Sequence, residues 1–242
     1  MGRGPSIEGR KSVEDSKRAR IFTRLIREIT VAARTGGAEP SGNARLRLAI
    51  ERAHSANMTK DTIERAIKRG SGGDGHDQTQ EIRYEGYAPG GVAILVDCVT
   101  DNATRTVAEV RNVFSKHGGS LGNPGSVAFQ FSHLGVLDFE TSSPSELEEK
   151  ILTIALETGA DDVRNEGSRC LVLTQPGQFE SVKAALLAAG ISPVSAQLSW
   201  RPLNPLSVSP EVAASLRKLI DHLDALDDVQ EIHHNAEPPG AA

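Results

Sequence analysis

The sequence predicts an α+β protein of three domains, and three observations support this fold class. Apolar side chains recur at helical spacing over residues 1–70, whereas strand-like runs alternate with helices in the remainder. A glycine-rich segment at residues 70–78 separates the two parts. The length of 242 residues suits two or three domains of ordinary size. The predicted divisions are a basic helical domain at 1–75, a middle α+β domain at 79–133 plus 203–235, an inserted α+β domain at 134–202, and a disordered tail at 236–242.

The N-terminal domain is expected to be a small bundle of three short helices. In "DSKRARIFTRLIREITVAAR", the apolar residues share one helical face. The segment "TGGAEPSGN" breaks this helix, and a second helix begins near Asn43. The third helix has Thr59 as its N-cap and ends before Gly70.

The middle domain is predicted from its strand pattern. "EIRYEGY" and "GVAILVDCV" indicate two strands joined by the turn "APGG", in which Gly90 or Gly91 takes a positive φ. A helix follows over about residues 103–117, with Asp101 or Asn102 as its N-cap, and "SVAFQFS" indicates another strand. One helix and one strand are still missing, and the C-terminal helix near 209–226 and the strand "VQEIHHN" would supply them.

The third region forms a β-α-β-β-α-β pattern by itself. Its strands are "GVLDFET", "ADDVRNE", "CLVLTQ" and "AQLSWRP", and its helices span about residues 144–158 and 176–189. This order is that of a ferredoxin-like domain. Because the pattern is complete in itself, we expect this region to be inserted into the middle domain.

The net charge of −5 conceals a strong asymmetry along the chain. Residues 1–70 contain 16 Lys and Arg against 8 Asp and Glu, a net charge of +8, whereas the other 172 residues contain 11 against 24, a net charge of −13. A basic N-terminal region joined to an acidic remainder is the pattern expected when one part of a protein binds a polyanion.

Arginines of the first helix recur at the helical period on a second face, which we expect to be exposed to solvent. Guanidinium groups pair with phosphate oxygens and release counterions, although an incidental basic surface is the alternative. No helix-turn-helix spacing or aromatic stacking platform is recognised, so binding to the backbone is expected rather than sequence readout. The candidate nucleic-acid-binding residues are Arg10, Lys11, Lys17, Arg18, Arg20, Arg24, Arg27, Arg34, Arg45, Arg52, Arg65, Lys68 and Arg69.

The stretch "RYEGYAPGGVAILVDCVTDN" suggests the alternative of a metal- or nucleotide-dependent enzyme that uses Asp97 and Asp101. A phosphate-binding loop follows a strand and opens a helix, whereas "APGG" joins strand to strand. We therefore favour a structural turn, and expect a non-enzymatic protein without a metal or cofactor. The sequence leaves open the role of the loop residues, which are Tyr84, Glu85, Gly86, Tyr87, Pro89, Gly90 and Gly91.

Other features favour a cytoplasmic protein with no membrane or small-molecule partner. Cys98 and Cys170 lie in separate apolar runs without metal-ligand spacing. We therefore expect both to be buried, reduced thiols. The uncharged stretch 184–200 contains Gly, Pro and serines, so it is unsuited to a bilayer. The N-terminus lacks the apolar core of a secretory signal.

The chain resembles the YebC family over nearly its full length. The matching segments are "KRARIFTRLIREITVAAR", "NARLRLAIERAHSANMTKDTIERAIKRG", "YEGYAPGGVAILVDCVTDNATRT", "GSVAFQF" and "LIDHLDALDDVQEIHHNAE". The family comprises probable transcriptional regulators (the PmpR type) and the mitochondrial translational activator of cytochrome c oxidase. The resemblance implies three domains, the third inserted in the second, and one of two non-enzymatic roles: binding promoter DNA, or assisting translation on the ribosome.

The N-terminus departs from the family pattern. The familiar branch begins with a "GHSKWxxIKHxK"-like segment, whereas this chain begins "MGRGPSIEGRK" and keeps only Arg10 and Lys11 of the basic tail. The implied partner is DNA or ribosomal RNA. An acidic body would be repelled by a long duplex, which favours the ribosome, where basic proteins lie beside RNA.

Overall fold

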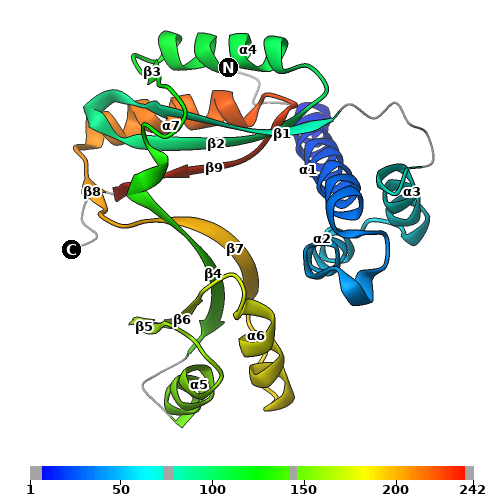
Figure 1. Cartoon of the computed structure of the whole chain (residues 1–242). Helices are drawn as coiled ribbons and strands as arrows, with labels where there is room; N and C mark the ends of the chain where they lie inside the picture. The colour runs from blue at the N-terminus through cyan, green and yellow to red at the C-terminus, as the bar shows by residue number, and fades with distance from the viewer. Residues whose placement is uncertain (1–6, 73–78, 142–145, 238–242) are drawn as a thin grey trace. The chain divides into compact units, whose positions relative to one another are not determined.

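The computed structural model describes residues 7–72, 79–141 and 146–237, and it confirms the mixed α+β class (Figure 1). The chain divides into two compact units. The first comprises the described residues up to Val127 together with Ser207–Ile232, and the second comprises Ala128–Leu206 with His233–Glu237. No helix in the described part of the chain is both long and apolar enough to cross a membrane.

Within residues 7–72, the first unit contains the helices α1 (Ile7–Gly36), α2 (Ala44–Ser55) and α3 (Lys60–Gly70), with a 3-10 turn at Pro40–Gly42. The prediction that all these helices are short is wrong for α1, which has 30 residues. Asn43 caps α2, because its Oδ1 accepts a hydrogen bond from the Leu46 N–H at 3.0 Å. Thr59 precedes α3, but its hydroxyl lies 2.9 Å from that of Thr62 and caps no backbone N–H.

These helices enclose an apolar core of their own. α3 comes very close to α1 at Gly70, where an added Cβ would lie 2.2 Å from the carbonyl oxygen of Thr30. The Thr30 hydroxyl, in turn, lies 3.3 Å from the carbonyl oxygen of Ala66. The buried core residues are Ile29, Ala32, Ala33, Leu46, Ala49, Ala53, Met58, Ile63 and Ala66.

The remainder of the first unit is built on a sheet with the order β3-β1-β2-β9. Its strands are β1 (Gln80–Tyr87), β2 (Ala93–Thr100), β3 (Ser120–Leu121) and β9 (Val229–His234). Figure 1 shows α4 (Ala103–Lys116) and α7 (Pro210–Asp224) along one face of this sheet. The predicted completion of the sheet by the C-terminal helix and strand is therefore confirmed.

The turn between β1 and β2 is a 3-10 turn at Pro89–Gly91. Both Gly90 (φ 79°) and Gly91 (φ 78°) take the positive φ that was expected of one of them. Gly86 is needed for a different reason, namely close packing. A Cβ there would lie 2.7 Å from both the Phe114 ring and the Ser120 carbonyl oxygen. Gly86 thus lets α4 and β3 pack closely on β1.

The second unit has the ferredoxin-like strand order β5-β6-β4-β7, with antiparallel pairing, as predicted. Its strands are β4 (Phe131–Glu140), β5 (Asp162–Glu166), β6 (Arg169–Thr174) and β7 (Ser195–Pro202). Its helices are α5 (Glu146–Glu157) and α6 (Phe179–Ala188). Short strands β8 (Leu206–Ser207) and β10 (Ala236–Glu237) pair with each other.

Two local predictions are wrong. "SVAFQFS" is not a strand, because Ala128–Gln130 forms a 3-10 turn and β4 begins only at Phe131. The predicted disordered tail begins at residue 236, but Ala236–Glu237 forms β10. Residues 238–242 of this tail, and residues 73–78 of the predicted linker, lie outside the described residues. The expected boundary between residues 133 and 134 falls within β4. The three-domain division stays a prediction.

Candidate nucleic-acid interface

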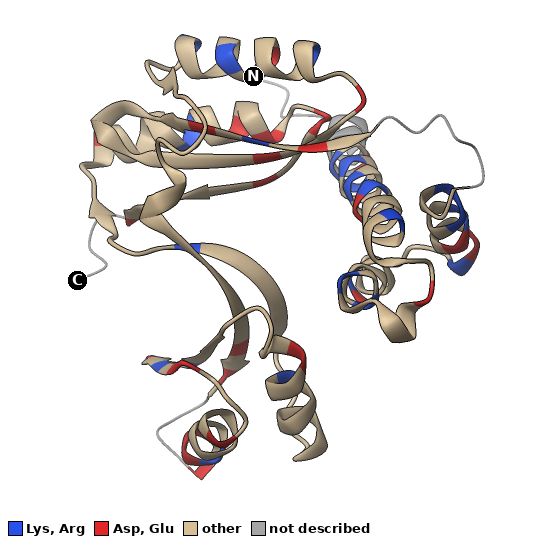
Figure 2. Ribbon diagram, viewed as in Figure 1, with Lys and Arg blue, Asp and Glu red and all other residues tan. Residues whose placement is uncertain are grey.

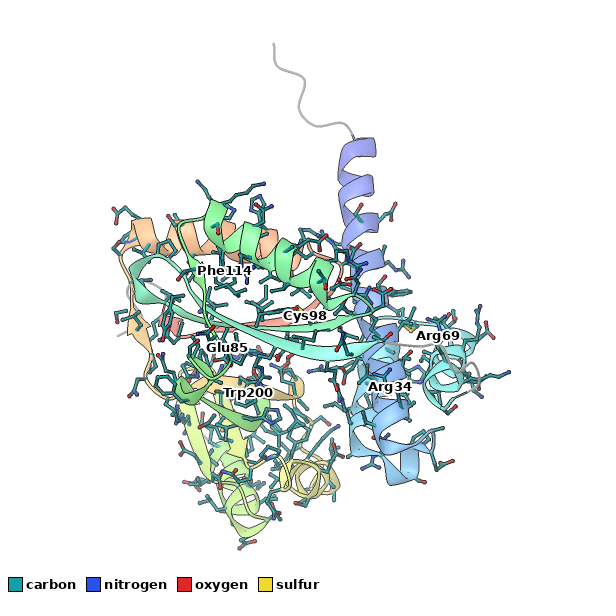
Figure 3. The ribbon with its side chains drawn as sticks, turned by 45° about the horizontal axis from the view of Figure 1, so that its top comes forward. Arg34, Arg69, Glu85, Cys98, Phe114 and Trp200 are labelled. Atoms are coloured by element: carbon teal, nitrogen blue, oxygen red, sulfur yellow. The ribbon has the colours of Figure 1, made fainter. Side chains whose placement is uncertain are left out.

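The structure divides the predicted nucleic-acid-binding residues into an exposed group and an ion-paired group. Lys17 and Arg18 on α1 and Lys68 and Arg69 on α3 are exposed. Figure 2 shows Lys and Arg side by side with few acidic residues along α1. Arg34, near the end of α1, is exposed as well (Figure 3). The exposed group is thus distributed over two helices.

Other residues of α1 contribute less to this surface. Arg20 is only half-exposed. Arg10 and Lys11 fall within α1, but their side chains lie outside the described part of the chain. The Arg18 guanidinium lies over the Phe22 ring, with Cζ 5.3 Å from the ring centroid, so a cation–π contact holds it against the helix.

Arg24 and Arg27 are held by the acidic turn that follows α7. Arg24 donates from Nη1 to Asp224 Oδ1 at 2.9 Å and from Nη2 to the Asp224 carbonyl oxygen at 2.7 Å. Arg27 donates to the Asp227 carbonyl oxygen, and its Nη2 lies 3.2 Å from Asp228 Oδ1. The expectation that these arginines face solvent is therefore wrong, since their side chains are only 22% and 26% exposed.

Arg45 and Arg52 of α2 are also paired with acidic residues. Arg45 donates from Nε to Glu28 at 2.7 Å and from Nη2 to Glu81 at 2.6 Å. Burial acts to lower the pKa of Arg45, but the hydrogen bonds to Glu28 and Glu81 outweigh it and raise this pKa above its ordinary value. Arg52 Nη1 lies 3.4 Å from Glu231 Oε1 on β9. These contacts attach α2 to strands of the sheet.

Periodicity alone could not reveal these contacts. It shows that Arg24 and Arg27 lie on a face other than the apolar one, but Asp224 is 200 residues away in the sequence. The sequence signal for this contact is the acidic run "DALDD", at the end of the predicted C-terminal helix.

The cations of α3 face water. Arg65 pairs with Asp61, and Lys60 lies 3.6 Å from Glu64, but all these side chains are at least 62% exposed. Exposed pairs of this kind add little stability and exchange readily for other anions. Lys68 and Arg69 lie in the last turn of the helix, where the dipole favours cations.

The Tyr84–Gly91 loop region serves the fold. The buried Glu85 carboxylate accepts hydrogen bonds from the N–H groups of Gly125 and Val127, each at 2.7 Å. The Tyr87 hydroxyl donates to the Ser126 carbonyl oxygen at 3.1 Å. Three successive residues after β3 are thus held by two side chains of β1 that lie two residues apart, a role that the sequence did not reveal.

The other positions of this region also make internal contacts. The Tyr84 hydroxyl donates to the Ala103 carbonyl oxygen at 3.4 Å, and burial is the largest cause of the raised pKa of Tyr84. A Cβ at Gly90 would lie 2.8 Å from Val212 Cγ1, so the turn Pro89–Gly91 lies directly against α7.

The carboxylates considered for catalysis are bound by arginines. Arg83 holds Asp97 across the β1–β2 pair, with Nε 2.6 Å from Oδ1. Arg105 lies 3.0 Å from Asp101, and Asn102, one of the two expected caps, accepts the Arg105 N–H at 3.0 Å. Within the described residues, no group of His, Cys, Asp and Glu side chains is arranged to hold a metal ion.

Asp228 is the polar centre that the sequence did not indicate. Its buried Oδ2 accepts hydrogen bonds from Thr100 (3.0 Å), Thr106 (2.8 Å) and Arg105 (2.8 Å). Burial acts to raise the pKa of Asp228, but the hydrogen bonds from Arg105, Thr106 and Thr100 outweigh it, so this pKa lies below its usual value. The motif "VTDNATRT" therefore builds a carboxylate-binding corner.

The two cysteines are buried free thiols. Burial, followed by the charges of Asp228 and Asp97, raises the pKa of the Cys98 thiol to about 12. Burial also raises the pKa of Cys170. Both thiols are therefore protonated and poorly nucleophilic at neutral pH.

The sequence and the fold are similar to those of known proteins. The model of the TACO1/YebC protein N-terminal domain matches residues 4–73, and that of the TACO1/YebC second and third domain matches residues 79–236. A probable transcriptional regulatory protein of Xanthomonas euvesicatoria is 52% identical over 240 residues, covering 98% of each chain. Another of that name, from Acidithiobacillus ferrooxidans, is 54% identical over 230 residues, which are 95% of this chain and 91% of that one.

The crystal structure of a conserved hypothetical protein from Aquifex aeolicus has the same fold. It superposes with a TM-score of 0.82 at 44% sequence identity, over 93% of this chain and 92% of that one. The matches of the two family models follow the division between the N-terminal helices and the remainder, and together they span nearly the whole sequence. The chain belongs to the TACO1/YebC family.

Proposed function

We propose that this protein is a non-enzymatic, nucleic-acid-binding regulator of gene expression that works in the cytoplasm and binds the phosphate backbone through its N-terminal helices. The observation that carries the proposal is the segregation of charge, with a net +8 over residues 1–70 and −13 over the rest. The names of the relatives, probable transcriptional regulatory proteins, support a role in regulation.

The exposed cations of α3 and of the first half of α1 are the ones we assign to phosphate binding. Lys68, Arg69, Lys17 and Arg18 are exposed, so a phosphate can approach them without displacing packed side chains. Arg65 gives up only an exposed pair with Asp61. Arg24, Arg27, Arg45 and Arg52 remain candidates, but each must first leave an internal acceptor.

Both DNA and ribosomal RNA suit this surface. The names of the relatives favour DNA, whereas the acidic remainder of the chain favours the ribosome, because a long duplex would repel it. The enzyme alternative is less well supported. Glu85 and Tyr87 are used to hold residues 125–127, and arginines hold Asp97 and Asp101.

A charge-reversal pair tests the proposed function. Lys68→Glu with Arg69→Glu should weaken binding to a labelled RNA hairpin or DNA duplex. The slope of log K against log salt concentration should become shallower by about two units, one for each lost phosphate contact. The matched control is Arg217→Glu with Lys218→Glu, which reverses an adjacent exposed Arg–Lys pair on α7. Fluorescence anisotropy over a salt titration measures both. Equal loss in the two double variants would show that binding does not depend on α3.

A further inference from the structure

The acidic turn at residues 224–228 pairs with Arg24 and Arg27 of α1, two of the candidate nucleic-acid-binding residues. We propose that this turn is a built-in competitor of phosphate, so that the Arg24–Arg27 face of α1 binds nucleic acid only when the turn is released. This inference rests on the proposed nucleic-acid binding and specifies how part of that surface is controlled.

The contact resembles phosphate recognition in its chemistry. Arg24 and Arg27 lie one helical turn apart on α1 and receive carboxylate oxygens from Asp224 and Asp228. The backbone adds the carbonyl oxygens of Asp224 and Asp227, at and just beyond the C-terminal end of α7, where the helix dipole is negative. A cluster of oxygens with negative charge, facing two guanidinium groups, is what adjacent phosphates also offer.

The outer part of the contact is weak enough to be displaced. The carboxylate of Asp224 is 53% exposed. The Arg52–Glu231 pair lies outside the turn, between α2 and β9, but it is a similar contact of the N-terminal helices, and Glu231 is 44% exposed. Water screens such pairs, so a polyanion that supplies several phosphates at once competes well with them.

The inner part of the contact tolerates release because Asp228 has a second cation. Arg105 donates to its Oδ2 at 2.8 Å, and the hydroxyls of Thr100 and Thr106 donate to the same atom. When Arg27 leaves, the Asp228 carboxylate therefore keeps a countercharge. The helices α1, α2 and α3 also have a separate apolar core, so they can move away from the turn without unfolding.

The test neutralises the two exposed carboxylates. Asp224→Asn with Glu231→Gln should tighten binding to a labelled RNA hairpin or DNA duplex, by about threefold for each change and about tenfold together, as expected when exposed ion pairs no longer compete. The control double variant, Asp221→Asn with Glu109→Gln, removes the same charge from exposed positions on α7 and α4. It should tighten binding far less.

Hydrogen exchange of the unmodified protein supplies a second readout. Saturating RNA hairpin should slow amide exchange in α3 and accelerate it over residues 224–232, because the turn is released as phosphate takes its place. If the double variant binds no better than its control, or if exchange over residues 224–232 slows, the turn does not compete and this inference is wrong, while the proposed function stands. If no form of the protein binds either probe, the proposed function fails and this inference fails with it.

Discussion

Asp228 shows how much a single buried carboxylate can organise. It is 2% exposed, yet it joins β2, α4 and α1 through Thr100, Arg105 and Arg27. A buried charge is costly unless it is paired and hydrogen-bonded. Here hydroxyl and guanidinium donors hydrogen-bond Oδ2, while Oδ1 accepts no hydrogen bond and has the Arg27 guanidinium 3.2 Å away. Removing the charge would leave those donors facing a weaker acceptor.

Asp228→Asn is expected to destabilise the protein in a pH-dependent manner. The pKa of Asp228 is lowered in the folded state, so its contribution is complete above the unfolded pKa and is lost as the pH falls through the folded pKa. At neutral pH, we expect a loss of about 2–4 kcal/mol in the free energy of unfolding. Below about pH 4 the difference from wild type should shrink. Urea unfolding over a pH series measures it, with Asp221→Asn as the exposed control, and a deficit independent of pH would contradict the assignment.

Glu85 is the second residue whose role only the structure shows. In the sequence it belongs to the segment Tyr84–Gly91, whose role the sequence leaves open, but its two oxygens each accept a backbone N–H of residues 125–127. An ionised carboxylate is a strong acceptor for such groups. The Glu85 carboxylate therefore holds the backbone of residues 125–127 against β1.

Among the secondary-structure elements, the crossing of α1 and α3 depends on one glycine. The apolar periodicity predicts which faces of the helices are buried, but not how closely they approach. Gly70 sets that distance, because an added Cβ would lie 2.2 Å from the Thr30 carbonyl oxygen and 2.9 Å from Ala33 Cβ. Neither the backbone oxygen nor the helical Ala33 can give way easily.

Gly70→Ala should destabilise the helical part by about 2–3 kcal/mol through overpacking, although alanine has the higher helix propensity. Gly42→Ala is the matched control, since nothing lies within 4 Å of its added Cβ. That variant should stay within about 0.5 kcal/mol of wild type. Chemical denaturation followed by far-UV circular dichroism compares the two. Equal stability of the two variants would show that α1 and α3 can separate without cost.

The failed strand prediction at "SVAFQFS" also has an elementary cause. Alternating apolar residues predict a strand when one face is buried, but here Val127 is fully buried and Phe129 is 70% exposed. The backbone of residues 125–127 bonds to Glu85 and Tyr87 instead of to a neighbouring strand. Hydrogen bonds to side chains of β1, which is distant in sequence, overrode the local pattern.

At the scale of the whole molecule, the segregation of charge bears on the choice of partner. A net −13 outside residues 1–70 disfavours a long DNA duplex, whereas a ribosomal site offers RNA together with basic proteins. We therefore expect ultraviolet crosslinking in cells, at native expression, to recover ribosomal and transfer RNA with little DNA. The variant Lys68→Glu/Arg69→Glu, expressed at the same level, should lose this signal.

The opposite result would be equally informative. Discrete promoter peaks, together with a preference of several kcal/mol over random duplex at physiological salt, would assign the protein to DNA. The salt dependence should then report how many phosphates the helices contact.

The sequence by itself determined the α+β class, the ferredoxin-like unit and the completion of the first sheet by α7 and β9. These follow from hydrophobic periodicity and from local caps such as Asn102, which act over a few residues. The same local signals located the basic residues on α1 and α3, and so predicted where the cations of the candidate site lie.

Only the tertiary structure decided which of those cations face water. Arg24 and Arg27 have the same periodicity as an exposed stripe, yet they meet Asp224, Asp227 and Asp228, about 200 residues away in the chain. Helical spacing fixes the direction of a side chain around its own axis and carries no information on what packs against that face. Charge attraction acts through space, so the partner of a charged residue is set by the fold rather than by its neighbours in sequence.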